Sequence, residues 1–383
     1  SSIHFTGSLA SLHRLVDAPL PPHALFNRQR IYDQLKLMTE SHGYMHAVQG
    51  MDWPYLWPDP FTMVHATAAV VLKDPDAAAH ERRALAALEA RQAANQGRMY
   101  DPEIAEKCHD IQDPMIVREC TIEGPARTYL LHRLLGPGPK PTPEADLRPR
   151  LRGVRVFPHA GFVFHRHDRG QTSFSWRNVI MALPLNSDGL YTVAPATGTL
   201  LARIQVRDLP DSHDLVSLRV EDHPDAFAAA LVMDRHQAAI RQEVLFASLP
   251  DGKVLLRERL VAQRELTVES LDQGFLRIIN ERFRGPEEPD AGSRTIHTPS
   301  GSEVFRGFVS TDPADDIVRT WKDIDRLNVD DRLGLVFRGT GQTVYHNRHY
   351  FKPWWAVTDD LILSRRETPF QARQGEVMAE FAC

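Results

Sequence analysis

Cysteine is scarce in this sequence. Only three cysteines occur among 383 residues, Cys108, Cys120 and Cys383, and no two of them have CxxC spacing. The set is too small for a disulfide-stapled scaffold and lacks the ligand spacing of a structural zinc site. Cys108 and Cys120 could pair if their helices lay side by side, but we favour three buried or free thiols. Cysteine usage therefore assigns no compartment.

Long apolar runs and a strong charge of either sign are also missing. No run approaches the roughly 20 apolar residues that cross a bilayer, and the formal net charge is −5. Neither nucleic acid nor a membrane is therefore an expected partner. Hydrophobic residues make up 42% and charged residues 25% of the chain, as in soluble globular proteins of two or three domains. The chain begins at Ser1 without a signal peptide, so we expect a mature or trimmed product.

Several catalytic signatures are absent as well. The sequence contains no GxSxG, no P-loop, no GxGxxG after a strand pattern and no HExxH. Their absence disfavours a serine hydrolase of the nucleophile-elbow type, an NTPase, a dinucleotide-binding enzyme and a zinc protease. Clusters of ionisable and aromatic residues are the remaining indication of function.

The residue pattern changes from helical to β-type along the chain. Helices are predicted from apolar spacing at 28–38, 60–72, 77–95 and 113–135. A Pro- and Gly-rich linker at 136–143 separates them from many short β-type runs with turn residues between them. We predict a multidomain α and β protein, with a helical domain at 1–143 and a large antiparallel β-sandwich domain at 151–383.

The stretch 152–204 predicts an unusually polar β-meander. Its side chains alternate with a period of two, so Arg166 lies on the opposite strand face from His165 and His167. The core of a meander is normally apolar, and this concentration of polar residues therefore indicates a surface that faces an interdomain cleft. Arg177 offers a guanidinium fork for the carboxylate of a uronic acid, although an ion pair at the sheet edge explains it equally well.

A metal site is the alternative reading of the same strand. His165 and His167 share a face and could chelate a divalent metal, with Asp168, His159 or a distant His as a third ligand. Nothing fixes that third ligand, so we favour a proton carrier or a substrate contact. No cofactor is predicted.

A long loop after the first predicted helix gathers ionisable and aromatic residues, namely His42, Tyr44, His46, Trp53 and Trp57. Tyr and His can move protons near neutral pH, and Trp offers a flat platform for a sugar ring. The alternative is that the aromatic residues fill a crevice between helices and the histidines are solvated. We favour a functional loop, because so long and rich a loop is unusual as a plain connection.

Four segments carry a family resemblance: FVFHRHDRGQTSFSWRN at 162–178, NSDGLY at 186–191, ASLPDG at 247–252 and DDRLGLV at 330–336. Together with the order of helices, linker and strands, they resemble polysaccharide lyases with an α/α toroid followed by antiparallel β-sheets. The resemblance is to the hyaluronate/chondroitin lyase group and to heparinase II/III-like enzymes. It implies an N-terminal, partial α/α toroid, because residues 1–143 supply about half the helices of a full one. A companion N-terminal segment missing from this chain is the other expectation.

In such lyases a Tyr and a His remove the proton at C5 of a uronate and release the 4-linked sugar, while an Asn or Arg neutralises the carboxylate. The resemblance implies that Tyr44 is the acid/base and that His42 or His46 is its partner. It also implies that His165 or Arg166 reaches in from the sandwich.

We therefore predict a secreted or periplasmic polysaccharide lyase that cleaves an acidic polysaccharide or oligosaccharide by β-elimination between the two domains. One alternative is a glycoside hydrolase of the same shape, which needs two carboxylates about 5–10 Å apart. Asp52, Asp59 and Glu123 are available for that role. The other alternative is a glycan-binding protein without catalysis, which would use its Trp and Arg residues only to hold sugar.

Overall fold

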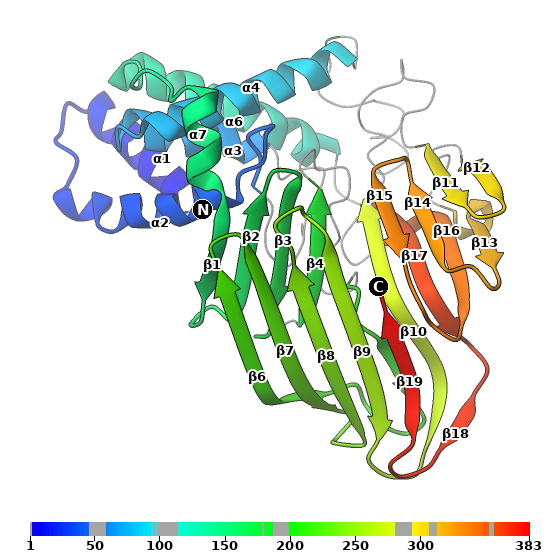
Figure 1. The fold of residues 1–383 in the computed structure, drawn as a ribbon. Helices are drawn as coiled ribbons and strands as arrows, with labels where there is room; N and C mark the ends of the chain where they lie inside the picture. Colours follow the sequence, from blue (N-terminus) through cyan, green and yellow to red (C-terminus); the bar gives the residue numbers. More distant parts are fainter. Residues whose placement is uncertain are drawn as a thin grey trace.

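The structure, a computed structural model, describes residues 2–45, 59–94, 97, 114–177, 180–186, 199–279, 293–305, 312–351 and 356–383. Helices come first in the chain, and Figure 1 shows them gathered at one end of the strands. The α-helices are α1 (Ser2–Leu15), α2 (Arg28–Leu35), α3 (Asp59–Val70), α4 (Pro75–Ala94), α6 (Pro114–Leu135) and α7 (Glu144–Leu151). Short 3-10 helices are η1 (Pro22–Leu25), η2 (Lys36–Met38) and η4 (Pro313–Asp315).

The four predicted helices are confirmed to within a few residues, and the linker at 136–143 has no regular structure. α6 continues through Pro125, although a proline inside a helix removes a backbone hydrogen bond. The sequence pattern missed α7, in which Pro149 and a high polar content hide the helical spacing. Among the described helices, none combines the length and the apolar character that a membrane span requires.

The strands form four antiparallel sheets. The first sheet has the order β1 (Gly153–Phe157), β2 (Phe162–His167), β3 (Gly170–Ser175), β4 (Met181–Asn186). The second has the order β19 (Val377–Ala382), β9 (Val254–Ala262), β8 (Ile240–Ser248), β7 (Ala226–Arg235), β6 (His213–His223).

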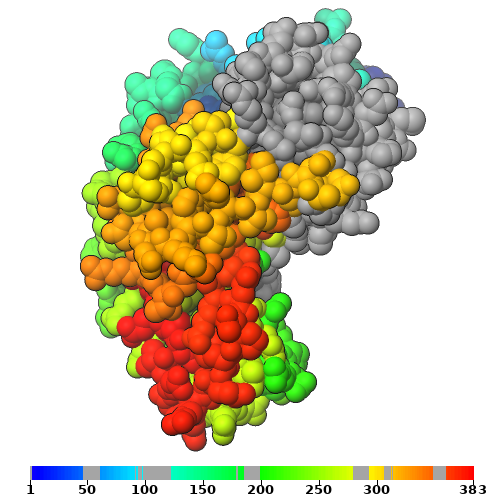
Figure 2. Space-filling view, turned by 90° about the vertical axis from the view of Figure 1, so that its right-hand side faces the viewer, coloured from blue at the N-terminus to red at the C-terminus, as the bar shows by residue number. Residues whose placement is uncertain are grey.

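The third and fourth sheets use mainly the C-terminal part of the chain, which is visible from yellow to red in Figure 2. The third has the order β13 (Ile317–Trp321), β16 (Gln342–Phe351), β17 (Ala356–Arg366), β10 (Leu266–Ile279), β18 (Phe370–Ala372), and β5 (Arg203–Val206) also pairs with β10. The fourth has the order β12 (Gly301–Phe305), β11 (Arg294–Thr298), β14 (Arg326–Val329), β15 (Leu333–Val336).

The predicted fold class, a partial α/α toroid followed by one large β-sandwich, is wrong. The strands divide among four sheets rather than the two sheets of a sandwich, and the described helical residues form six separate α-helices rather than a toroid. The pairings that decide the sheets are distant in sequence, since β10 pairs with β5, β17 and β18 while β19 returns to β9. A period of two identifies a strand but not its neighbours. The predicted meander is confirmed in part: the strands between residues 153 and 186 form the first sheet, residues 187–198 lie outside the described residues, and β5 belongs to the third sheet.

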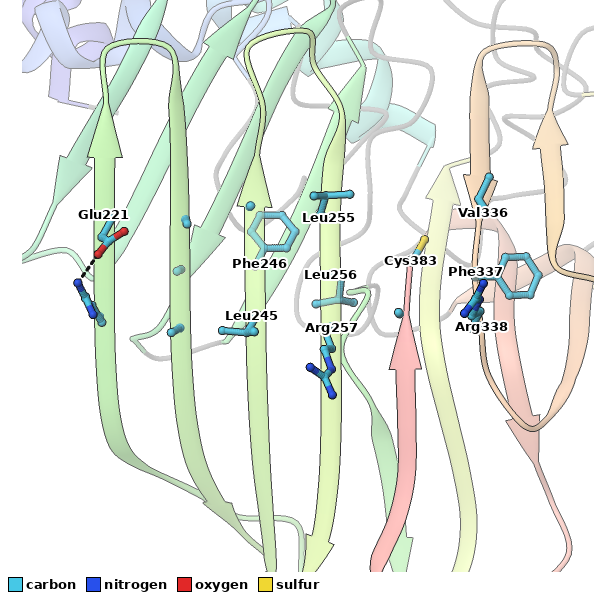
Figure 3. A pocket seen from close by; sticks show the side chains of 16 residues that line it. Glu221, Leu245, Phe246, Leu255, Leu256, Arg257, Val336, Phe337, Arg338 and Cys383 are labelled. Atoms are coloured by element: carbon cyan, nitrogen blue, oxygen red, sulfur yellow. Dashed lines mark ion pairs between the residues drawn. The ribbon is translucent and has the colours of Figure 1, made fainter.

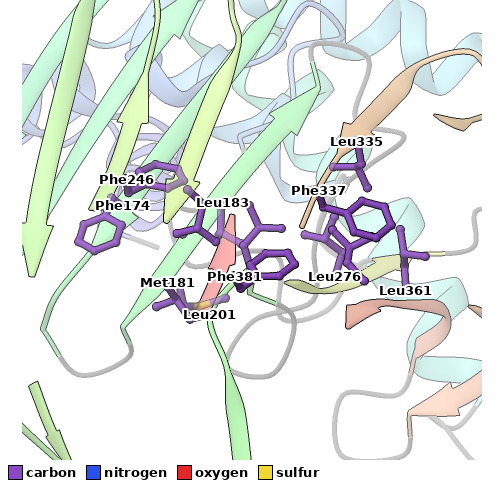
Figure 4. Packing of buried hydrophobic residues seen from close by; sticks show 14 of the residues in the cluster. Phe174, Met181, Leu183, Leu201, Phe246, Leu276, Leu335, Phe337, Leu361 and Phe381 are labelled. Carbon is purple, nitrogen blue, oxygen red and sulfur yellow. The ribbon is translucent and has the colours of Figure 1, made fainter. Parts of the chain in front are cut away.

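One apolar cluster draws side chains from all four sheets. Phe174 of the first sheet stacks on Phe246 of the second, with ring centroids 5.4 Å apart. Leu276 and Leu361 come from the third sheet and Leu335 from the fourth. Figure 4 shows these residues converging from their different strands. The sheets are therefore joined by shared hydrophobic burial, which is the main favourable contribution to folding.

We expect Phe174→Ala to lower the free energy of unfolding by about 3–5 kcal/mol, because it deletes a fully buried ring and leaves a cavity between two sheets. Chemical denaturation followed by circular dichroism measures this. Phe26 is 72% exposed, so Phe26→Ala is the matched control and should change stability by less than about 0.5 kcal/mol. Equal losses in the two variants would contradict the assignment of this core.

Candidate functional site

His42 and Tyr44 lie on a short turn after η2, which we call the Tyr44 turn (Thr39–Met45). Thr39 and Met45 form an antiparallel bridge that closes the turn. Within it, Glu40 N donates to Tyr44 O at 2.7 Å and Gly43 N donates to Glu40 O at 3.0 Å. Gly43 has φ +81°, and a Cβ there would lie 2.4 Å from Ala84 N, so only glycine fits.

The rings of His42 and Tyr44 are neighbours on this turn and are both half-buried. Their centroids are 4.7 Å apart and their planes are inclined by 44°. Tyr44 N donates to His42 Nδ1 at 3.2 Å. Because Nδ1 accepts this bond, a neutral His42 carries its proton on Nε2. The turn thus brings a phenol and an imidazole of defined tautomer together at the protein surface.

The helical region holds the Tyr44 turn through His65 of α3. His65 Nε2 donates to Gly43 O at 2.7 Å, so His65 Nδ1 is the acceptor for Tyr32 Oη at 2.8 Å. Both side chains are fully buried, and burial lowers the pKa of His65 to about 4 and raises that of Tyr32 well above its usual value. The histidine is therefore neutral near pH 7 and acts as a fixed hydrogen-bonding strut.

The first sheet holds the same turn through Arg166 of β2. Arg166 Nη2 donates to Leu37 O at 3.0 Å and Thr39 O at 2.5 Å, while Nη1 donates to Glu40 Oε2 at 3.2 Å. The Glu40 side chain is fully buried and that of Arg166 is 10% exposed. Phe164, two residues earlier on β2, packs among Leu37 and other apolar residues of the helical region. This face of β2 is therefore the one that meets the helices.

His165 and His167 lie on the opposite face of β2, against the second sheet. His165 Nδ1 lies 2.8 Å from Ser248 Oγ. His167 Nδ1 accepts from Arg169 N at 3.2 Å, so its Nε2 donates to Thr172 Oγ1 at 3.3 Å. Burial is the main cause that lowers the pKa of both histidines to about 4. The two share a face, as the alternation predicts, but the strand itself separates them from Tyr44.

The proposed metal ligands do not converge. Asp168 is exposed and pairs with Arg152 at 3.1 Å, whereas His165 and His167 point toward the second sheet. In the part of the chain that the structure describes, no three His, Cys, Asp or Glu side chains are placed to hold a metal ion. Cys383 is a free thiol there, and Cys108 lies outside that part.

Arg177 lies at the far end of the β2–β3 hairpin from Arg166. Arg166 pairs with Gln171 at one end of the hairpin, and Phe162 pairs with Ser175, two residues before Arg177, at the other. Four residues of strand separate the two ends by about 13 Å. Arg177 is exposed, and its guanidinium donates to His159 O.

The remaining predicted site residues, His46, Trp53 and Trp57, lie outside the described residues, as does Asp52. Asp59 begins α3, and Glu123 is half-exposed and pairs with Arg127 on α6. The structure therefore brings together His42, Tyr44 and, through Glu40, Arg166. It places His165 and Arg177 elsewhere.

Sequence reasoning missed Glu40, Tyr32 and His65. His65 had a usable signal, because it is an ionisable residue in the middle of the apolar helix α3 and buried histidines need partners. Glu40 had no such signal in the sequence, because glutamate is common after a helix and its partner Arg166 lies 126 residues away.

An apolar groove of about 640 Å³ lies on the second sheet, away from the Tyr44 turn. Figure 3 shows Leu245 and Leu255 on its floor and Val336 across from them. Arg257 and Arg338 stand at its rim. Its charged lining includes the ion pair between Arg219 and Glu221, which Figure 3 marks with a dashed line.

Comparisons with known proteins leave the family open. No family model matches the chain, and neither does any curated protein. The galactosidase domain of the α-galactosidase–sucrose kinase AgaSK is 9% identical over 60% of this chain and 41% of its own, with a TM-score of 0.37. The GH36 α-galactosidase AgaB from Geobacillus stearothermophilus is 10% identical over 60% of this chain and 40% of its own, with a TM-score of 0.39.

Heparinase III aligns with 98% of this chain and 60% of its own, at 10% identity and a TM-score of 0.29. The chain spans about two fifths of the length of the two galactosidases. These neighbours are glycan-acting enzymes, a lyase among them. All three TM-scores are below 0.5, so the likenesses assign neither a family nor an activity to this chain.

The buried histidines predict a loss of stability in mild acid. In the unfolded chain a histidine titrates near pH 6.5, whereas His65, His165 and His167 have folded pKa values of about 4. The unfolded state therefore binds more protons between pH 6.5 and 4, and stability falls as the pH drops through this window. Each histidine contributes at most about 1.4 kcal/mol per pH unit. Denaturant midpoints between pH 7.5 and 4.5 measure the slope.

His165→Gln should reduce this slope, because glutamine keeps a polar contact for Ser248 but does not titrate. His213 lies exposed on the edge strand β6, and His213→Gln is the matched control, with the slope unchanged. A slope in His165→Gln that equals that of the unaltered protein would show that His165 charges freely in the folded state.

Proposed function

We propose that the chain is a carbohydrate-active enzyme that cleaves a uronic-acid-containing glycan by β-elimination, with Tyr44 as the acid/base and His42 as its partner. The observation that carries the proposal is the adjacency of the two rings on one anchored turn, 4.7 Å apart and half-exposed. An acid and a base at that separation can both reach one sugar ring. The buried Tyr32–His65 pair has similar chemistry but no access to substrate.

The proposed reaction uses one base and one acid. His42, as the base, takes up the proton from C5 of the uronate, the C4–O bond breaks, and a C4=C5 double bond forms in the product. Tyr44 returns a proton to the departing oxygen. His42 Nδ1 is engaged by Tyr44 N, so Nε2 is the ring atom with which His42 would exchange a proton.

In this proposal, a group other than Arg166 neutralises the carboxylate of the uronate substrate. The guanidinium of Arg166 is already compensated by the buried carboxylate of Glu40. Arg177 is exposed at the other end of the β2–β3 hairpin, and it is the guanidinium that we propose for the carboxylate of a further sugar unit. Trp53 and Trp57 are the proposed sugar platforms.

The hydrolase alternative is less well supported. It needs two carboxylates about 5–10 Å apart at the cleaved bond, and Glu40, the acidic residue of the Tyr44 turn, is buried against Arg166. The proposal keeps a helical domain at 1–143, a β domain at 151–383 and an acidic polysaccharide or oligosaccharide as substrate. Secretion or a periplasmic location suits such a substrate.

We expect Tyr44→Phe to lower kcat on uronic-acid polysaccharides by about 10²–10⁴-fold, because the phenol hydroxyl supplies the acid/base step. The assay follows the ultraviolet absorbance of the unsaturated uronate product. Tyr129→Phe is the matched control, since Tyr129 is 68% exposed on α6, and its activity should be unchanged.

Three results would argue against the proposal. Full activity in Tyr44→Phe would remove Tyr44 from the chemistry. New reducing ends without absorbance would indicate hydrolysis. Retention on immobilised glycan without any cleavage would indicate a binding protein.

A further inference from the structure

We infer that Arg166 is the positioning residue through which the first sheet sets the place of Tyr44. The catalytic part of this inference rests on the proposed function, whereas its geometric part stands by itself. Among the described residues, the side-chain hydrogen bonds of Arg166 go to Leu37, Thr39 and Glu40. It acts on the backbone and on the one carboxylate that the Tyr44 turn is built around.

The guanidinium fork reaches three points at the entrance of the turn. It binds two carbonyls, Leu37 O and Thr39 O, and the carboxylate of Glu40. The arginine side chain can make these three hydrogen bonds because its five N–H donors lie in one rigid plane, and the single ammonium group of lysine cannot reproduce them. The entrance of the turn is therefore fixed in both distance and orientation relative to β2.

Backbone hydrogen bonds connect the residues that Arg166 binds to Tyr44. Glu40 N donates to Tyr44 O, and Thr39 bridges to Met45 on the other side of Tyr44. The residues that Arg166 holds are thus the hydrogen-bonded partners of the residues at and after Tyr44. His65 fixes Gly43 from the helical side, so Tyr44 sits between two anchors.

Stability alone does not explain the pair. A buried ion pair loses most of its Coulomb energy to desolvation, and apolar side chains of similar volume are often as stable or more so. The neighbours on this face of β2 are apolar, with Phe164 packed among Leu37, Leu147 and Leu151. An apolar residue at 166 alone would leave the buried Glu40 carboxylate and two backbone carbonyls without their donor, so only a joint apolar replacement of Arg166 and Glu40 would suit these surroundings. What the joint replacement would lose is the defined register between the sheet and the turn.

The experiment compares Arg166→Met, Arg166→Lys and Glu40→Gln with Arg235→Met. Arg235 is the matched control because it is equally buried, at 8%, and binds Asp211 and Gln242 in the second sheet, away from the turn. Hydrogen exchange of the peptide that covers residues 36–45 reports on the turn. The initial rate of unsaturated-product formation gives kcat and KM.

We expect Arg166→Met to speed amide exchange in 36–45 by at least about 10-fold and to lower kcat by about 10–100-fold, since a shift of 1 Å can cost about 10² in rate. KM should change less than threefold. For Arg166→Lys, both the exchange rate and kcat should lie between the values of Arg166→Met and of the unaltered protein. Glu40→Gln should give values similar to those of Arg166→Lys. Arg235→Met should lower the melting temperature but leave both readouts unchanged.

Unchanged exchange in 36–45 for the folded Arg166 variants would overturn the inference, as would equal effects from Arg166→Met and Arg235→Met. If Arg166→Met does not fold, the inference is tested with Arg166→Lys and Glu40→Gln, again by hydrogen exchange in 36–45 and by kcat. An unaltered protein without lyase activity would defeat the proposed function alone, because hydrogen exchange still tests the positioning role.

Discussion

The burial of β2 on both faces is the constraint on which the rest of the structure depends. The helical region covers one face and the second sheet covers the other. A buried polar group without a partner costs about 1–3 kcal/mol, so the polar side chains of this strand need partners, and two of them find these in the covering layers. Glu40 serves Arg166 and Ser248 serves His165. One strand of six residues thereby ties three layers together.

This constraint also decides which residues can share a catalytic site. Side chains two apart on β2 face the same layer, and neighbouring side chains face different layers. Arg166 therefore reaches the Tyr44 turn, and His165 cannot. His42 and Tyr44 remain half-exposed because the turn stands at the edge of these layers.

Local features of the fold followed from the sequence, because they depend on residues close in the chain. Apolar spacing located α2, α3, α4 and α6, and alternation placed His165 and His167 together. The number of sheets did not follow, because hydrogen bonds between β10 and β5 or β18 join segments far apart. The partner of Arg166 was equally hidden, since nothing near Glu40 in the sequence marks it as the end of a contact across 126 residues.

A concentration of polar residues on strands can have two physical causes, and the burial of these residues shows which of the two applies in this protein. One is a surface that meets a ligand; the other is a hydrogen-bonded layer between packed elements. Between the third and fourth sheets, Arg294 Nε donates to Asp359 Oδ2 at 2.8 Å and Asn347 Nδ2 donates to Asp359 Oδ1 at 2.9 Å, with all three side chains buried. The meander histidines belong to the same class. Exposure, which no period-two pattern encodes, distinguishes the half-buried His42–Tyr44 pair from these buried hydrogen-bonded layers.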